Sequence, residues 1–176
     1  MLFGTETAEL AVLDFIQKTF KCGFLDFLMP WMSWLGNGGM IWIAITVFML
    51  LSKKYRKTGI MNVAALICCL LIVNIGLKNL VARPRPCWLN DGVQMLIAIP
   101  KDFSFPSGHS AASFAAACVI FSQYKKTGIA AMALAALIAF SRMYLYVHFP
   151  TDILGGVIIG VLIGIIVPSV FKKRTY

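Results

Sequence analysis

Long apolar stretches separated by short charged ones limit most strongly what this chain can fold into. Residues 60–77, 129–147 and 150–171 each come close to the roughly 20 residues that an α-helix needs to cross a bilayer. With 60% hydrophobic residues over 176 positions and a mean hydropathy of +0.83, the chain is too apolar for a soluble domain. The sequence predicts an all-α fold, a polytopic membrane helix bundle that forms a single domain over residues 1–176.

Five spans are expected, and a sixth depends on the N-terminal region. The expected spans cover residues 40–51 with their flanks, 60–77, 107–121, 129–147 and 150–171. Residues 7–21 combine apolar positions near helical spacing with charged ones, which is typical of an amphipathic helix in the membrane interface. The apolar stretch 24–35 has only about half the length of a span. Residues 1–35 are therefore expected to form amphipathic or short helices, and they supply a sixth span only as a short or broken helix.

The positions of the basic residues indicate the orientation of the bundle. A net charge of +9, from 16 Lys and Arg against 7 Asp and Glu, would by itself suit nucleic acid, an anionic membrane surface or a phosphorylated substrate. Basic clusters at 53–57, 125–126 and 172–174 follow the first, third and fifth expected spans. Clusters of this kind face the cytoplasm in membrane proteins. The sequence thus predicts a multi-pass protein of the cell membrane, without a nucleic-acid partner, whose opposite connections lie on the extracytoplasmic face.

The extracytoplasmic connections carry an excess of cations. Ionisable groups at a membrane edge are energetically costly unless they form ion pairs or take part in the function. Asp152 is the one acidic residue associated with a span near these cations. Lys78 supplies a point charge, while Arg85 and Arg142 offer planar forks of N–H donors, a combination that suits the non-bridging oxygens of a phosphoryl group. These residues predict a binding site for a phosphate.

A second connection has the features of an anion-binding helix start. Pro106 stops a preceding helix, Ser107 is a good N-cap, and Gly108 allows a close approach of the backbone to a ligand. The backbone amides of residues 107–109 could then point at an anion. His109, in the first turn, is one of two histidines in the chain.

The two histidines and Asp152 suggest nucleophilic chemistry. His148 and Asp152 are four positions apart, so the carboxylate can orient the imidazole if both lie on or next to one helical turn. If Pro150 is the first helical residue, His148 lies just outside the helix. His148 could then attack phosphorus to form a phosphohistidine while His109 protonates the leaving oxygen.

A metal site formed by His109, His148 and Asp152 is the rival interpretation. Clustered cations and the lack of a second carboxylate make a divalent ion unfavourable, so no metal or other cofactor is expected. Beyond Asp152, Gly156, Gly160 and Gly164 form a stripe of small residues that predicts close packing against another helix.

Three segments together resemble the signature motifs of the type 2 phosphatidic acid phosphatase family, which shares its active site with vanadium haloperoxidases. They are Lys78 to Pro86 (KNLVARPRP), Pro106 to His109 (PSGH) and Ser141 to Asp152 (SRMYLYVHFPTD), so the motifs cover residues 78–152. The resemblance implies a metal-free reaction with His148 as nucleophile, Asp152 as its orienter and His109 as general acid. It also implies a set of phosphate-binding residues: Lys78, Arg85, Ser107, Gly108 and Arg142.

The resemblance implies an integral membrane lipid phosphatase of bacterial type. Undecaprenyl diphosphate is the favoured substrate, and phosphatidylglycerophosphate or phosphatidic acid is the alternative, because the motifs bind the phosphate and not the lipid tail. A hypothesis of another class is a transporter for an anion or a lipid phosphate, which would use the same cations for binding alone.

Overall fold

The computed structural model describes residues 4, 6–90 and 92–173, and all regular structure in these ranges is helical. This confirms the all-α prediction. The elements in chain order are α1 (Glu6–Phe20), α2 (Gly23–Gly36), η1 (Asn37–Gly39), α3 (Met40–Leu51), α4 (Arg56–Cys69), η2 (Leu70–Leu77), α5 (Lys78–Val81), α6 (Pro86–Leu89), α7 (Gly108–Gln123), α8 (Lys125–Tyr144) and α9 (Pro150–Lys173).

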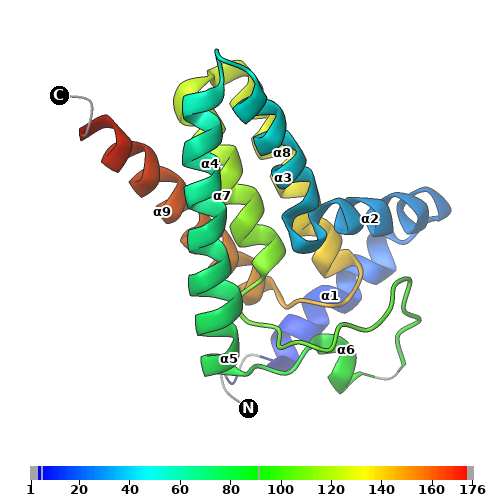
Figure 1. Cartoon of the computed structure of the whole chain (residues 1–176). Helices are drawn as coiled ribbons and strands as arrows, with labels where there is room; N and C mark the ends of the chain where they lie inside the picture. The colour runs from blue at the N-terminus through cyan, green and yellow to red at the C-terminus, as the bar shows by residue number, and fades with distance from the viewer. Residues whose placement is uncertain (1–3, 5, 91, 174–176) are drawn as a thin grey trace.

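Within the described residues, four helical stretches are long and apolar enough to cross a membrane. They are Gly23–Leu51, Arg56–Leu89, Lys125–Tyr144 and Pro150–Lys172. The span predicted at residues 107–121 forms α7, which is shorter at 16 residues and lies in the middle of the bundle, against α4, α8 and α9 (Figure 1). Four of the five or six predicted spans are thus supported by length and composition.

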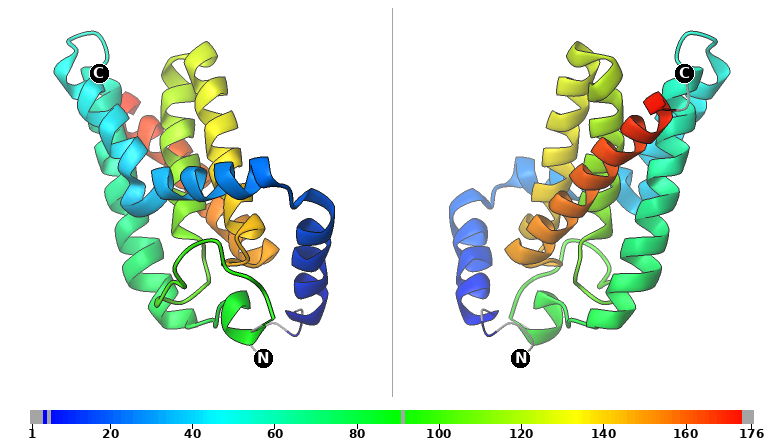
Figure 2. Two further views of the ribbon diagram at one scale, coloured as in Figure 1. Left: turned by 90° about the vertical axis from the view of Figure 1, so that its right-hand side faces the viewer. Right: turned by 90° about the vertical axis from the view of Figure 1, so that its left-hand side faces the viewer.

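The stretch Gly23–Leu51 is bent and does not form one rod. Gly38 and Gly39 have φ angles of +57° and +74°, in the left-handed region that glycine adopts without steric cost. The turn at these residues leaves α3 along the bundle and α2 across it (Figures 1 and 2). Residues 24–35 therefore form a separate short helix, whose Phe24 and Phe27 side chains are exposed.

The helix predicted at residues 60–77 is longer at both ends. It begins at Arg56, passes from α4 into the π-helical segment η2 and continues through α5 to Val81. Ala82, with a φ of +47°, ends the helix in the left-handed conformation, and the proline at position 84 prevents it from resuming. This end places Lys78 in the last turn.

The glycine stripe of α9 packs against α7, as predicted. A Cβ atom added at Gly160 would lie 2.4 Å from the backbone oxygen of Ala111, and one at Gly156 would lie 2.5 Å from that of Ser107. Since real Cβ atoms do not approach this closely, the two backbones touch only because glycine occupies these positions. The contact brings the N-terminal turns of α7 and α9 together.

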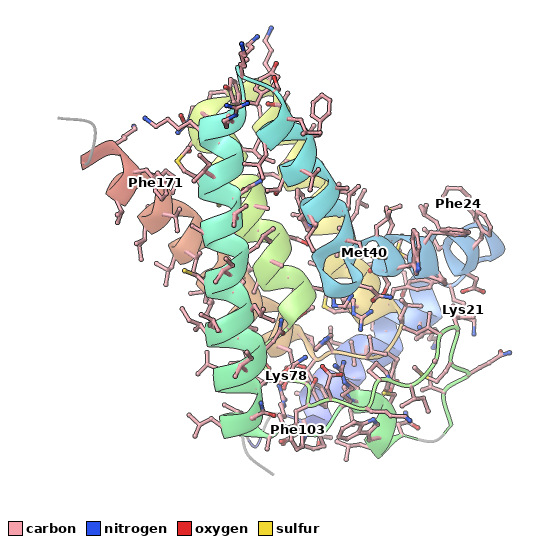
Figure 3. The ribbon with its side chains drawn as sticks, viewed as in Figure 1. Lys21, Phe24, Met40, Lys78, Phe103 and Phe171 are labelled. Atoms are coloured by element: carbon pink, nitrogen blue, oxygen red, sulfur yellow. The ribbon has the colours of Figure 1, made fainter. Side chains whose placement is uncertain are left out.

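The basic clusters gather at one end of the bundle. The α3–α4 turn with the start of α4, which carry residues 53–57, and the start of α8, which carries residues 125–126, lie side by side at the top of Figure 1. Lys78 and Phe103 lie at the opposite end (Figure 3). Of the cluster predicted at 172–174, Arg174 lies outside the described residues.

Candidate active site

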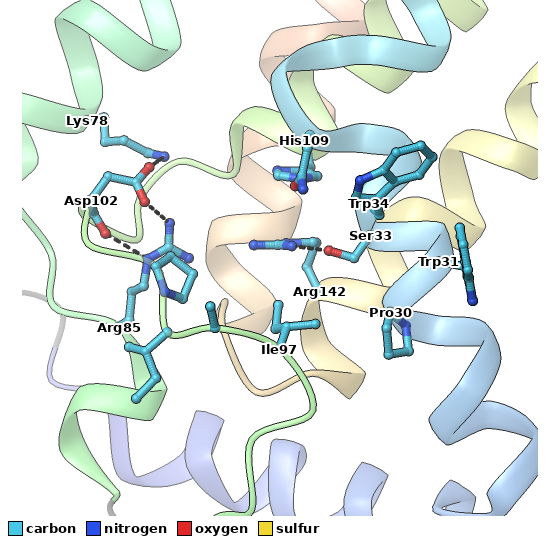
Figure 4. A pocket seen from close by; sticks show the side chains of 14 residues that line it. Pro30, Trp31, Ser33, Trp34, Lys78, Arg85, Ile97, Asp102, His109 and Arg142 are labelled. Carbon is cyan, nitrogen blue, oxygen red and sulfur yellow. Dashed lines mark hydrogen bonds and ion pairs between the residues drawn. The ribbon is translucent and has the colours of Figure 1, made fainter.

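A cavity of about 900 Å³ opens at the end of the bundle that carries α5. It is surrounded by the C-terminal half of α2, by α5, by the loop after α6, and by the facing ends of α7 and α8 (Figure 4). Its lining consists of Pro30, Trp31, Ser33, Trp34, Asn37, Lys78, Arg85, residues 97–100, Asp102, His109 and Arg142. The expected cations Lys78, Arg85 and Arg142 therefore converge on one space, although they come from two widely separated segments.

Arg85 is held rigidly at the edge of the cavity. Its Nε donates to the backbone oxygen of Asp102 over 2.7 Å, and its Nη1 donates to the backbone oxygen of Val147 over 2.6 Å. Its Nη2 donates to the Asp102 carboxylate over 2.8 Å. With its side chain 2% exposed, Arg85 presents a fixed guanidinium fork.

Asp102, which stood outside the predicted site, pairs with Lys78 and Arg85 of the first motif. Its carboxylate accepts from Arg85 and forms an ion pair with Lys78 (Figure 4). Burial alone would raise the pKa of Asp102, but the hydrogen bond from Lys78 and the charge of Arg85 hold this pKa well below its usual range. Asp102 therefore stays ionised and occupies the cations where an external anion would bind.

Arg142 completes the cationic side of the cavity. It is 3% exposed, and its Nη1 donates to the hydroxyl of Ser33 on α2. Its buried Nε has no hydrogen-bond partner among the described residues. A buried guanidinium with a donor left over is suited to a ligand that brings acceptor oxygens.

His148 lies just outside α9, in the loop after α8, as the position of Pro150 predicted. The side chain is 1% exposed, and its Nε2 lies 3.2 Å from Nη1 of Arg85. Because a guanidinium can only donate, Nε2 acts as the acceptor and Nδ1 carries the proton. Burial, together with the charges of Arg85 and Arg142, lowers the pKa of His148 well below its ordinary value, so the imidazole is neutral.

The Nδ1 side of His148 faces Asp152. The distance from Nδ1 to the Asp152 carboxylate is 3.5 Å, and that to the Ser104 hydroxyl is 3.4 Å. The carboxylate itself is fixed by Arg83 Nη1 at 2.7 Å, by the Phe149 amide at 2.8 Å and by the Ser104 hydroxyl. Asp152 is the third residue of α9, so it also caps its own helix. The arrangement fixes the Asp152 carboxylate beside Nδ1 of His148, which is the position expected of an orienter.

His109 lines the cavity from the first turn of α7. Its Nε2 lies 2.9 Å from the amide oxygen of Asn37, which accepts the Nε2 proton. A Cβ atom at Gly36 would lie 2.7 Å from Cδ2 of His109, so the absence of a side chain there lets the end of α2 pack on the ring. The α2–α3 bend therefore positions this imidazole.

Ser107, an expected phosphate-binding residue, lies at the start of α7. Ser107 is the N-cap of α7, as predicted, and its hydroxyl accepts from the amide and the hydroxyl of Ser110. Its own amide donates to the backbone oxygen of Asp152 over 3.0 Å, and the residue is fully buried. The hydroxyl is therefore used within the first turn of α7, and the amide joins α7 to α9. Gly108 follows at the surface of a neighbouring groove, where a Cβ atom would lie 2.3 Å from the Asn74 side-chain oxygen.

Sequence reasoning missed several polar partners because each comes from a distant segment. They are Glu9, Ser33, Asn37, Asp102 and Ser104. No local sequence pattern predicts these contacts. As for metal ligands, no group of three or more His, Cys, Asp or Glu side chains within residues 6–90 and 92–173 is placed to hold an ion.

Several known proteins are similar to this chain. The undecaprenyl-diphosphatase of Sulfolobus acidocaldarius is 31% identical to this chain over 137 residues, which are 77% of this chain and 66% of the relative. The chain thus spans slightly less than two thirds of that relative's length.

Two crystal structures resemble the whole fold. LpxE of Aquifex aeolicus has a TM-score of 0.80 and 28% identity, over 91% of this chain and 94% of LpxE. A transmembrane PAP2-type phosphatidylglycerolphosphate phosphatase from Bacillus subtilis has a TM-score of 0.77 and 26% identity, over 99% of this chain and 89% of that one. Residues 59–176, which include all three motifs, match the model of the PAP2 superfamily. This chain therefore belongs to the PAP2 superfamily.

Proposed function

We propose that this protein is a membrane lipid phosphatase that hydrolyses a phosphate ester or a diphosphate through a phosphohistidine. One observation carries the proposal: Nε2 of a neutral, buried His148 lies 3.2 Å from Arg85, which lines a cavity together with Lys78 and Arg142. A phosphoryl group bound by Arg85 would therefore lie close to Nε2 of His148. The membership in the PAP2 superfamily supports the same activity.

In the proposed reaction, Nε2 of His148 attacks phosphorus, and an N–P bond forms as the bond from phosphorus to the leaving oxygen breaks. His109 donates a proton to that oxygen, and Asp152 stabilises the positive charge on His148. Lys78, Arg85 and Arg142 stabilise the equatorial oxygens of the transferring group. Water then attacks the phosphohistidine while His109 takes its proton, which releases phosphate and restores both histidines. No step needs a metal ion.

Besides Lys78, Arg85 and Arg142, the backbone amide of Gly108 is proposed to donate a hydrogen bond to the phosphate. Gly108 is the first residue of the 16-residue helix α7, so its N–H has no partner within the helix. Ser107 contributes indirectly, by joining the start of α7 to the backbone of Asp152.

The apolar surroundings of the cavity support a lipid substrate. Trp31, Trp34, Ile97 and Ile99 line the cavity beside the cations. A second groove, of about 510 Å³, begins at Lys78, Asp102 and His109 and continues along α3 and α4. Its far part is lined by the apolar side chains of Ile43, Val47, Leu50, Val63, Leu66 and Leu70. A charged head group in the cavity and a hydrocarbon chain in this groove would satisfy both surfaces.

The favoured substrate is undecaprenyl diphosphate, because the relative from Sulfolobus acidocaldarius bears that activity in its name. Phosphatidylglycerophosphate is the second candidate, because the Bacillus subtilis structure is of a phosphatase for that lipid. A side-by-side assay of undecaprenyl diphosphate, phosphatidylglycerophosphate and phosphatidic acid should give the highest kcat/KM for the first. A higher value for either glycerolipid would replace it as substrate.

Release of inorganic phosphate separates the phosphatase from a transporter. The wild-type protein should release phosphate from the lipid and remain active with chelator, whereas His148→Ala should release none above background. A transporter would move the ligand across vesicles without hydrolysis, and would tolerate loss of His148.

The active site is proposed to face the outside of the cell membrane. The clusters at 53–57 and 125–126 lie together at the opposite end of the bundle, which supports a cytoplasmic position for that end. Single cysteines introduced at Lys54 and Gly92 into a cysteine-free chain should react with an impermeant reagent from opposite sides. Reaction from the same side would contradict the proposed orientation.

A further inference from the structure

A buried ion network lies behind the cavity, and it includes Arg83, an arginine of the first motif. Arg83 is fully buried and is not among the residues that line the cavity. Its Nη1 donates to Asp152 over 2.7 Å and to the Thr151 hydroxyl over 2.8 Å, while its guanidinium stacks 4.0 Å from the ring centre of Phe149. Arg83 therefore faces the start of α9 and not a ligand in the cavity.

The other end of the network comes from the N-terminal helix. Glu9 on α1 accepts from Nη2 of Arg83 over 2.5 Å. Its second oxygen accepts from the Thr151 amide over 2.9 Å and from the Thr151 hydroxyl over 2.6 Å. Because the first amides of a helix lack intrahelical partners, Glu9 caps the first turn of α9 from another helix. Glu9 lies outside residues 59–176, which match the superfamily.

The network fixes the orienter of the nucleophile from two sides. Asp152 receives one donor from Arg83 and one from its own helix cap at Phe149, so its carboxylate cannot rotate without breaking both. Arg83 in turn is held by Glu9 over 2.5 Å. When both carboxylates are ionised, Glu9, Arg83 and Asp152 together carry one negative charge, which is of the sign that favours a cationic His148 during attack on phosphorus.

We propose that Glu9 and Arg83 are positioning residues for the reaction, and that α1 thereby takes part in catalysis without touching the substrate. This inference rests on the phosphatase function proposed above. The competing view is that the network only stabilises the fold. Since a buried ion pair contributes little net stability over an apolar replacement, stability alone is a weak reason for burying three charged groups.

The Glu9→Gln variant tests the proposal, because it keeps the size of the side chain and removes its charge. We expect kcat for lipid phosphate hydrolysis to fall by about tenfold or more per folded enzyme, with KM changed less than about twofold, since Glu9 is not part of the cavity. The matched control is Glu6→Gln, one turn earlier on α1 and equally buried, which should retain the wild-type kcat. Thermal unfolding in detergent measures the folded fraction of each variant.

A double-mutant cycle shows whether the effect passes through Asp152. In an Asp152→Asn background, Glu9→Gln should lower single-turnover rates by less than about twofold, because the group it positions is already lost. An equal fall in both backgrounds, or a wild-type kcat in Glu9→Gln, would overturn the inference. If Glu9→Gln does not fold, Arg83→Lys provides the same test. Wild-type protein that releases no phosphate would instead refute the proposed function itself.

Discussion

Replacing Asp102 with asparagine should strengthen the binding of inorganic phosphate to the cavity. The Asp102 carboxylate pairs with Lys78 and accepts from Nη2 of Arg85 over 2.8 Å, so it occupies two of the three cations that are proposed to hold the phosphate. An incoming phosphate has to displace it. The free energy of these internal contacts is therefore subtracted from the affinity for the external anion.

The size of the effect follows from the exposure of the carboxylate. A hydrogen bond to a charged group contributes roughly 1.5–3 kcal/mol when it is shielded. The Asp102 side chain is 56% exposed, however, and exposed ion pairs contribute about 0–1 kcal/mol, so we take a value of about 1 kcal/mol. At about 1.4 kcal/mol per factor of ten, the inhibition constant for phosphate should fall by about fivefold.

The substitution should change little else. Arg85 keeps its bond to the backbone oxygen of residue 102 over 2.7 Å and its bond to Val147 over 2.6 Å, and neither involves the carboxylate. The assay is competitive inhibition of lipid hydrolysis by inorganic phosphate at neutral pH and fixed salt. Asp26→Asn, at an acidic residue of α2 that does not line the cavity, serves as the control. An unchanged or higher inhibition constant in Asp102→Asn would refute the reasoning, because the carboxylate would then be organising the cations and not competing for them.

Three further predictions concern packing, the general acid and pH. Gly160→Ala should lower the free energy of unfolding by about 1–3 kcal/mol, seen as a lower melting temperature in detergent, whereas Gly23→Ala, where a Cβ atom meets nothing within 4 Å, should not. Asn37→Ala should lower kcat by about tenfold with little change in phosphate affinity, since it removes the 2.9 Å contact that orients His109; an unchanged kcat would show that the imidazole orients itself. Because the pKa of His148 is lowered, the nucleophile stays neutral as the pH falls through 6.5, so kcat/KM should decline only at lower pH; an acid limb centred at or above 6.5 would contradict this.

Features governed by local rules could be predicted from the sequence. Ser107 was expected to cap a helix, and α7 begins at the next residue. Pro150 was expected to be the first helical residue, which leaves His148 just outside α9, and both hold in the structure. The spacing of the α9 glycines likewise predicted the close contact with α7. Each of these depends on residues that are neighbours in sequence or one helical turn apart.

Features that depend on distant pairing could not be predicted. Arg83 and Arg85 are two positions apart, yet Arg85 lines the cavity and Arg83 is buried behind it. The partner of Arg83 on α1 lies 74 residues away. The crosswise position of α2 has a similar cause, since the glycines at 38 and 39 permit a bend but do not set its direction.

The most direct test of the account is to trap the covalent intermediate. Wild-type protein mixed with a lipid diphosphate labelled in its terminal phosphate, then quenched in alkali within milliseconds, should carry an alkali-stable, acid-labile label on the peptide that contains His148. His148→Ala should carry no label. Any phosphohistidine that His109→Ala forms should accumulate, because this variant no longer activates the water that hydrolyses it. Label on another residue, or a labelled His148→Ala protein, would contradict the assignment of His148 as the nucleophile.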